Sequence, residues 1–353
     1  MLYELITRAH SEGASDIHLR PGSVPRVRID GELFDVEGNV LTDEEFREFL
    51  LGMLTPEQLR TFDRVRDLDF SATVKGVCRV RVNLFSQQGT PCSALRLIPN
   101  SIPTMDDLML PKVLQRFLDL PRGLVLVTGP TGSGKSTTLA SMLNTINQRR
   151  RCHILCIEDP IEYIYDEKLS TISQREVQLD TQTFNSALRH SFRQDPDVVL
   201  LGEMRDQESM QTALTLAETG HLTFSTLHTG ESSQTINRII DSFPPHQQAQ
   251  IRTQLAVSLE GIVAQRLLPR CDKRGRVAVF EVLICTRGVK NLIREGKTHQ
   301  IPSAIQTGIE EGMITLNSSL AERIEQGLID YDTAHLAAWD RAAFAEKHAR
   351  RKR

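Results

Sequence analysis

Nine residues near the middle of the chain have the types and the spacing needed to hold a phosphate chain. They read GPTGSGKST and fit the pattern G-x-x-x-x-G-K-[ST], in which glycines allow a tight turn and a close approach of backbone N–H groups to an anion. An apolar run at 124–127 precedes them and a helical pattern follows, which is the strand–loop–helix context that this pattern requires. The predicted phosphate-binding residues are Gly129, Pro130, Thr131, Gly132, Ser133, Gly134, Lys135, Ser136 and Thr137.

Two side chains of this segment add chemistry to the backbone. Lys135 is expected to reach the β- and γ-phosphates as a point charge, and the Ser136 hydroxyl is expected to bind Mg²⁺. The start of the following helix contributes the positive end of its dipole. The sequence therefore predicts ATP and Mg²⁺ as cofactors.

Carboxylates follow two other apolar runs. Glu203 comes shortly after one of them, and Glu158, Asp159 and Glu162 follow the other. Because ligands bind outside the carboxyl ends of parallel strands, Glu203 is expected near Mg²⁺ or the attacking water. The three clustered carboxylates repel one another unless a cation or a base role offsets the repulsion, which favours a function over a solvated loop. The alternative for Glu203 is a surface acid at a strand end.

Histidines and arginines are candidates to complete the site. His221 and His228 flank a β-prone run and are expected at its two ends, with His228 at the carboxyl end near the γ-phosphate. Taken alone, each histidine fits a structural role as well. Arg81 lies on the alternating stretch CRVRVNLF and Arg96 on the next predicted strand. Hydrolysis usually needs an arginine near the γ-phosphate, which a neighbouring domain or subunit could supply, whereas a solvated stripe is the simpler alternative.

The surrounding patterns predict two domains. Residues 1–98 read as a small α+β domain with a hairpin turn at Asp30-Gly31 and a helical stretch over 42–63, where Thr42 and Glu45 form a capping box. Prolines mark a linker at 99–111. Over 112–286 strands alternate with helices, which predicts a mostly parallel sheet. Residues 287–353 read as short helices with a basic tail. The expected strands lie at 124–127, 153–157, 198–201 and 222–227, and the expected helices at 136–149, 183–193 and 207–219.

Composition excludes several classes of protein. The chain has 353 residues and a formal net charge of −3, so it has no general attraction to nucleic acid and no nucleic-acid partner is expected. No apolar run approaches the roughly 18 residues of a membrane span, and the amphipathic N-terminus is not a secretory signal, which predicts a cytosolic protein. The six cysteines are scattered without a C-x-x-C pair, which argues against zinc and disulfides.

Four segments together resemble the secretion ATPase superfamily, also called the GspE/PilT family. The segments 129–137, 157–163, 195–206 and 221–229 look like its Walker A motif, Asp box, Walker B motif and His box, in order and spacing. The stretches ASDIHL, RVNLFSQ and THQIPSAIQTG look like those of the PilT-type ATPases of type IV pili within it. The family's AIRNLIRE motif appears here as GVKNLIRE, and the residues from about His335 match nothing in it.

The resemblance implies a fold and a function. It implies an N-terminal PAS-like α+β domain, a RecA-like P-loop ATPase domain and a C-terminal helical segment, assembled as a homohexamer. It further implies that ATP hydrolysis drives type IV pilus retraction, with pilin disassembly and twitching motility, at the cytoplasmic face of the inner membrane. A platform protein of that membrane and a second retraction ATPase would be the partners. The roles implied are Glu203 as the Walker B glutamate and Mg²⁺ ligand, Glu162 as the Asp-box general base, His221 and His228 as the His-box pair, and Arg81 and Arg96 as arginines from the first domain.

Other functions stay open at this point. A PilU-type accessory retraction ATPase and a type II or type IV secretion-system ATPase share the same motifs. A nucleic-acid motor is disfavoured by the acidic balance of the chain. A nucleotide-gated scaffold is disfavoured by the presence of Glu162 and Glu203, because a scaffold needs no carboxylate to place water.

Overall fold

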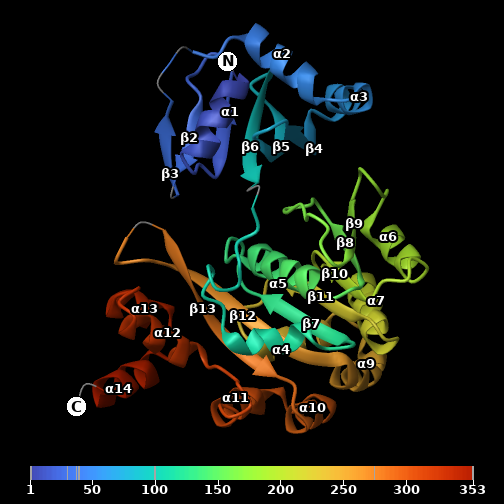
Figure 1. Cartoon of the computed structure of the whole chain (residues 1–353), viewed down its shortest axis with the longest axis vertical. Coiled ribbons are helices and arrows are strands. Elements are labelled where there is room, and N and C mark those ends of the chain that lie inside the picture. The colour runs from blue at the N-terminus through green and yellow to red at the C-terminus, as the bar shows by residue number, and fades with distance from the viewer. Residues whose placement is uncertain are drawn as a thin grey trace. The chain divides into compact units, whose positions relative to one another are not determined.

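The computed structural model describes residues 2–29, 31–36, 38, 40–98, 101–273 and 275–351, with side chains up to residue 346. The chain splits into two compact units (Figure 1). The first comprises Met1–Ser101 with Glu162–Ile164, and the second comprises Ile102–Ile161 with Tyr165–Arg353. Three predicted features fall partly outside the described residues: Asp30 of the hairpin turn, Pro99 of the linker and the end of the basic tail.

Antiparallel strands and helices build the described part of the first unit. Its strands form one sheet in the order β3-β2-β1-β6-β5-β4. On β5 the residues Val80, Val82 and Leu84 are buried while Arg81 and Asn83 are partly exposed, which confirms the predicted alternation. The elements are α1 (Leu2–Ser11), β1 (Asp16–Leu19), β2 (Arg26–Ile29), β3 (Glu32–Asp35), α2 (Asp43–Met53), α3 (Pro56–Val65), β4 (Asp67–Val74), β5 (Cys78–Gln87) and β6 (Thr90–Ile98).

Residues 42–63 are largely helical, as predicted. The capping box of Thr42 and Glu45 is present at the start of α2. The stretch is divided into two helices, because α2 ends at Met53 and α3 begins at Pro56. Proline has no N–H to donate within a helix and fits its first position, and Thr55 caps the new helix with a second capping box.

A mostly parallel sheet forms the centre of the second unit. Seven strands of its described part run in the order β13-β12-β7-β11-β10-β8-β9, and only β13 is antiparallel to its neighbour. The strands are β7 (Gly123–Thr128), β8 (His153–Glu158), β9 (Thr171–Glu176), β10 (Val198–Leu201), β11 (Leu222–Leu227), β12 (Leu259–Pro269) and β13 (Arg276–Ile284). The four strands predicted from apolar runs are therefore confirmed as β7, β8, β10 and β11.

Helices connect these strands and complete the unit. The three helices predicted between the strands correspond to α5, α6 and α7. The helices are η1 (Lys112–Leu114), α4 (Gln115–Leu118), α5 (Lys135–Arg149), α6 (Phe184–Ser191), α7 (Gln207–Glu218), α8 (Ser232–Asp241), α9 (Pro245–Ser258), α10 (Arg287–Arg294), η2 (Thr298–Gln300), α11 (Ile301–Thr307), α12 (Leu316–Glu325), α13 (Tyr331–Ala337) and α14 (Arg341–Arg351).

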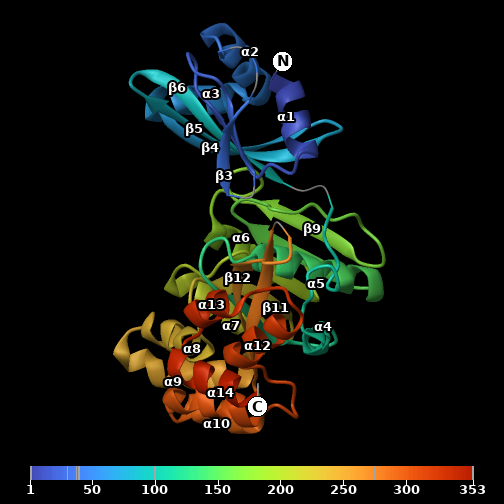
Figure 2. The same cartoon turned by 90° about the vertical axis from the view of Figure 1, so that its left-hand side faces the viewer.

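The last helices pack beside the antiparallel pair β12 and β13 (Figure 1 and Figure 2). Val277 and Val279 of β13 form one apolar cluster with Leu320 of α12, Ala334 of α13 and Phe344 of α14. This packing makes the C-terminal helices part of the second unit. The predicted fold class, an α+β domain followed by an α/β domain with a helical C-terminal segment, is therefore confirmed.

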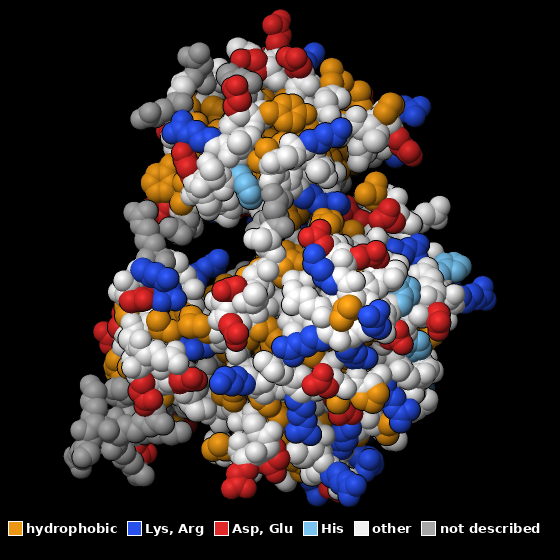
Figure 3. Space-filling view, in the orientation of Figure 1, with side chains coloured by type: hydrophobic (Ala, Val, Ile, Leu, Met, Phe, Trp, Pro, Cys, Tyr) orange, Lys and Arg blue, Asp and Glu red, His pale blue; other side chains and the backbone are white. Residues whose placement is uncertain are grey.

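The surface of the second unit carries charges of both signs on the face seen in Figure 3. On the face of the second unit seen in Figure 3, Lys and Arg side chains are interspersed with Asp and Glu side chains. Mixed charge of this kind is typical of a solvent-exposed surface. Within the described ranges, no helix has both the length and the apolar character that crossing a bilayer requires.

Candidate nucleotide-binding site

The phosphate-binding loop joins the buried strand β7 to helix α5. Gly134 lies at the helix start with φ of 86°, and no side chain caps the helix there. Gly129 has φ of 145°, and a Cβ at that position would lie 2.2 Å from the backbone carbonyl oxygen of Gln265. Both positions therefore require glycine. A helix start that follows a glycine-rich loop and has no side-chain cap is the arrangement that binds anions.

Lys135 bends back over this loop. Its Nζ donates to the carbonyl oxygens of Gly129 at 2.8 Å and of Pro130 at 3.1 Å, and it lies 3.5 Å from Nδ1 of His228. The side chain is buried. The ammonium group is thus fixed over the loop, where its charge would act on a bound phosphate.

A residue that the sequence did not reveal supports the loop from the neighbouring strand β12. Gln265 Nε2 donates to the carbonyl oxygen of Ser133 at 2.7 Å, and Gln265 Oε1 accepts from Thr138 Oγ1 at 2.7 Å. Gln265 is buried. No local pattern marks a glutamine of this kind, because its partners lie more than a hundred residues earlier in the chain.

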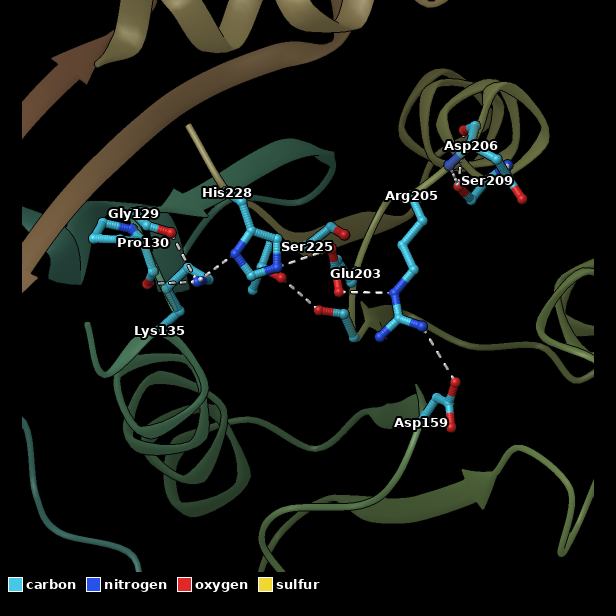
Figure 4. Close-up of polar contacts among 12 residues, drawn as sticks. Gly129, Pro130, Lys135, Asp159, Glu203, Arg205, Asp206, Ser209, Ser225 and His228 are labelled. Atoms are coloured by element: carbon cyan, nitrogen blue, oxygen red, sulfur yellow. Dashed lines mark hydrogen bonds and ion pairs between the residues drawn. The ribbon is translucent and has the colours of Figure 1, made fainter. Parts of the chain in front are cut away.

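Polar contacts run from Lys135 to Asp159 along the carboxyl ends of four parallel strands (Figure 4). His228, which follows β11, places Nε2 3.0 Å from Oε1 of Glu203, which follows β10. Oε2 of Glu203 accepts from Nε of Arg205 at 2.9 Å, and Arg205 Nη1 lies 3.5 Å from Oδ2 of Asp159. The structure therefore brings Lys135, His228 and Glu203 together, as the parallel sheet predicts.

Protonation within this group follows from the neighbours. The Lys135 ammonium can only donate, so Nδ1 of His228 is assigned as the acceptor and the ring proton lies on Nε2, facing Glu203. The hydrogen bond that Arg205 donates to Glu203 raises the pKa of the Arg205 guanidinium, which stays charged. The role of Arg205 was not predicted, although it lies two residues after Glu203 in the predicted strand-end motif.

Backbone contacts hold Glu203 between two strands. The N–H of Gly202 donates to the carbonyl oxygen of Ile157 on β8 at 2.9 Å, and its carbonyl accepts from Thr226 Oγ1 on β11 at 2.7 Å. The N–H of Met204 donates to the carbonyl oxygen of Thr226 at 3.1 Å. The backbone on both sides of Glu203 is thus held, which limits where its carboxylate can lie.

The two histidines lie at opposite ends of β11, as predicted from their spacing. His221 precedes the strand, and Leu222, the next residue, pairs with Gly123 at the start of β7. Its Nδ1 lies 3.0 Å from the carbonyl oxygen of Leu216. The structure therefore does not bring His221 together with the phosphate-binding loop of its own chain.

The predicted arginines belong to the first unit, on its open sheet. Arg81 on β5 is paired with Arg96 on β6, and Arg96 with Asp16 on β1. Directly opposed residues of antiparallel strands point to the same face, so these side chains form a row. Nε of Arg96 lies 3.0 Å from Oδ1 of Asp16, and Nε of Arg28 lies 4.0 Å from Oδ2. Asp16, in the ASDIHL stretch, is a further site candidate because it orients Arg96.

Glu162 is also grouped with the first unit, together with Tyr163 and Ile164. In the chain, Glu162 comes shortly after β8. Directly before it, the N–H of Ile161 donates to a carboxylate oxygen of Glu176 on β9 at 3.2 Å. Glu162 is therefore assigned to a different unit from Lys135, His228 and Glu203.

The loop suits a nucleotide better than an isolated metal ion. Ser133 Oγ is buried and has no hydrogen-bond partner, directly beside the helix start, and a Cβ at Gly129 would lie 2.7 Å from it. Among the described residues no group of three or more His, Cys, Asp or Glu side chains could hold a metal ion. Mg²⁺ commonly binds through one or two protein oxygens together with substrate phosphates, which fits Ser136 and Glu203 as the predicted ligands.

A parallel sheet with a P-loop, an acidic strand end and a histidine at one edge defines a P-loop nucleotide-binding protein. The chain belongs to the family of type II/IV secretion system proteins, whose profile matches residues 1–334.

Similar proteins narrow the class. The chain is 44% identical over 331 residues to the type IV pilus retractation ATPase PilT of Pseudomonas aeruginosa, covering 94% of this chain and 96% of that protein. It is 39% identical over 335 residues to the type IV pilus ATPase PilU of the same organism, covering 95% and 88%. The crystal structure of the pilus retraction motor PilT with bound ADP matches with a TM-score of 0.89 at 44% identity, covering 96% of this chain and 97% of that one. The predicted PilT-type ATPase of the secretion superfamily is thereby confirmed.

Proposed function

We propose that this chain is a hexameric motor that hydrolyses Mg-ATP to retract a type IV pilus. The observation that carries this proposal is the group formed by Lys135, His228 and Glu203 at the P-loop edge of the sheet. The similarity to the retractation ATPase PilT supplies the kind of work that hydrolysis would drive. The motor would act at the cytoplasmic face of the inner membrane, on a platform protein of the pilus.

Each residue of the site has a proposed task. The loop N–H groups and Lys135 hold the β- and γ-phosphates, and Ser136 and Glu203 hold Mg²⁺. Mg²⁺, when bound, neutralises the charge that develops on the phosphates. His228, with its proton directed to Glu203, orients that carboxylate next to Lys135. Glu162 acts as the general base, and His221 and His228 form the pair of the His box.

A neighbouring subunit completes the site in this proposal. Arg81 and Arg96 lie on one face of the first unit, where a second copy of the chain could present its nucleotide. Their guanidinium groups would neutralise the γ-phosphate from outside the P-loop domain. Hydrolysis would release this contact and let the two units rotate about the linker. Arg81→Ala should then reduce hydrolysis while isolated subunits still bind nucleotide.

The first experiment is phosphate release from purified protein with Mg-ATP over a dilution series. Specific activity should fall on dilution and disappear in Glu203→Gln, while Glu310→Gln, at an exposed position of the same unit, should keep it. A specific activity that does not change with protein concentration would contradict an active site shared between subunits. Activity absent at every concentration, with the platform protein present, would overturn the motor.

Retraction itself needs a test in cells. Cells that lack their own gene for this chain should lose twitching motility and carry excess pili, and the wild-type chain but not Glu203→Gln should restore retraction. The similarity to PilU supports a second retraction ATPase as a partner. If pili retract without the chain and its loss only weakens retraction under load, the PilU-type accessory role replaces the proposal. If pili are normal and protein export fails, the secretion-system ATPase replaces it.

A further inference from the structure

Trp339 lies in a part of the chain beyond the family match, which ends at residue 334. Its ring covers the guanidinium of Arg266, with Cζ 3.5 Å from the ring centroid. Nη1 of the same arginine donates to the carbonyl oxygen of Ala337 at 2.9 Å. Burial lowers the pKa of Arg266, and Glu231 and Glu281 oppose this effect. The turn between α13 and α14 is therefore attached to strand β12 by one half-buried arginine.

The position of Trp339 is set by a folded core on both sides of the turn. Ala337 and Ala338 before it and Phe344 after it are buried in the cluster that includes β13. The ring of Phe344 stacks on Tyr331 at a centroid distance of 5.9 Å. The backbone at Trp339 is thus anchored on both sides by its own segment, while the indole itself is 41% exposed.

The other neighbour of the indole is the loop that follows His228. A Cβ on Gly230 would lie 2.8 Å from the Trp339 ring and 3.6 Å from the Arg266 guanidinium. Two residues further, Ser232 donates to Oε1 of Glu281 on β13 through its N–H at 2.9 Å and its hydroxyl at 2.7 Å. The loop from His228 to Ser232 therefore contacts Trp339 at Gly230 and β13 at Ser232. A side chain at position 230 would have no room beside the Trp339 ring.

Strand β12, which carries Arg266, also supports the phosphate-binding loop, from the face opposite to Trp339. Gln265, adjacent to Arg266, bonds Ser133 and Thr138, and adjacent residues of a strand point to opposite faces. One short stretch of β12 thus contacts the P-loop on one face and Trp339 on the other.

We propose that Trp339 is a positioning residue of the hydrolysis site, acting through Gly230 on His228. It fixes the exit of β11, so that His228 stays between Lys135 and Glu203. This rests on the proposed ATP hydrolysis but not on pilus retraction or on the hexamer. The C-terminal turn would therefore control turnover rather than nucleotide binding.

Trp339 is the single tryptophan of the chain, so its fluorescence reports on this contact alone. Titration of the wild-type protein with Mg-ADP should change the emission with the same midpoint as binding measured by equilibrium dialysis. Lys135→Ala should abolish both. His228→Ala should keep binding but reduce the emission change. Flat emission while dialysis shows saturation would overturn the proposal, and this readout needs no hydrolysis.

Kinetics give an independent test. Trp339→Ala should lower kcat for ATP about tenfold, as small displacements of catalytic groups do, and leave KM within about twofold. Trp339→Phe keeps a ring over Arg266 and should recover most of kcat. Leu336→Ala, at an exposed position of the same segment, is the matched control and should match wild type.

A double-mutant cycle separates positioning from general damage. If Trp339 acts through His228, adding Trp339→Ala to His228→Ala should lower the residual kcat no further. An equal fall in both backgrounds would overturn the proposal. If Trp339→Ala does not fold, the fluorescence titration of the wild-type protein still decides.

Discussion

Gln265 Nε2 donates a 2.7 Å hydrogen bond to the carbonyl oxygen of Ser133, 132 positions earlier in the chain. The same amide accepts from the hydroxyl of Thr138. One side chain of β12 therefore holds both the end of the phosphate-binding loop and the first turn of α5. The shape of that loop depends on a strand that is antiparallel to β13 on one side and parallel to β7 on the other.

Gln265→Ala should damage this support directly. It leaves the Ser133 carbonyl and the Thr138 hydroxyl without their partner in a buried position, which costs about 1–3 kcal/mol of unfolding free energy. A loss of about 1.4 kcal/mol from binding would raise the Kd for nucleotide tenfold. Urea denaturation and nucleotide titration measure the two effects. Gln250→Ala, at an exposed position, is the control, and an unchanged Kd in Gln265→Ala would contradict the expectation.

Gly129→Ala should abolish nucleotide binding. Its Cβ would lie 2.2 Å from a backbone oxygen of β12, which cannot move without disturbing the sheet. Gly220→Ala is the matched control. Gly220 also has a positive φ, 117°, but no atom lies near the position of its Cβ, and it precedes β11, away from the phosphate-binding loop. The control should lose about 1–2 kcal/mol of stability and keep its affinity. Equal affinities in the two variants, measured by equilibrium dialysis, would argue against the close approach.

Arg96→Ala should slow hydrolysis without weakening nucleotide binding by isolated subunits. An arginine at the γ-phosphate contributes about 10³-fold or more in related chemistry, so kcat should fall by about that factor at high protein concentration. Arg26→Ala is the control, because Arg26 is exposed and pairs with Asp35 instead. Phosphate release and equilibrium dialysis, run on both variants, measure the effect. A parallel loss of binding would show that Arg96 acts within its own subunit.

Asp16→Asn tests whether the carboxylate orients Arg96. Removing the charge removes the 3.0 Å ion pair but keeps the size of the side chain. The exposed pair itself contributes little stability, so the melting temperature should stay within a few degrees. The kcat for ATP should fall, and the loss should not add to that of Arg96→Ala. Additive losses would mean that Asp16 acts elsewhere.

Glu281→Gln should stabilise the protein at neutral pH more than at acid pH. Burial raises the pKa of Glu281 most strongly, and Glu231 adds to this, while hydrogen bonds from Ser232 and the charge of Arg266 lower it. A raised folded-state pKa means that the folded state binds the proton more tightly, so stability falls as pH rises through the unfolded and then the folded pKa. Glutamine has no such charge. The gain in melting temperature over wild type should therefore increase between pH 4 and pH 7, and a gain independent of pH would contradict this.

Local patterns predicted much of the second unit. Strands β7 and β10 contain continuous apolar runs because both of their faces are covered, and such runs are visible in sequence. Strand β9 was missed because its residues, TISQRE, are largely polar at the edge of the sheet. Strands β12 and β13 were missed as sheet members because β12 pairs with β7 across more than a hundred residues, and no local pattern records such a pairing.

The residues of the site could be predicted from the sequence where the order of parallel strands fixes their position. Parallel strands place their carboxyl ends together, so Glu203 and His228 could be expected near Lys135. Arg205 and Gln265 could not, because each acts through a side-chain hydrogen bond that depends on three-dimensional neighbours. The predicted helical stretch over 42–63 is divided because Pro56 and its cap Thr55 start a new helix, α3.

Strand β7 lies between β11 and β12, and both are synthesised after it. The ribosome must add about 140 residues beyond β7 before β12 is complete, which takes roughly 7–28 s at about 5–20 residues per second. During this time the emerging apolar strand has an unpaired edge, which exposes the nascent chain to aggregation. The sheet of the first unit is complete by Ile98 and can form during that interval. Cells that make this protein therefore need chaperones for the nascent second unit more than for the first.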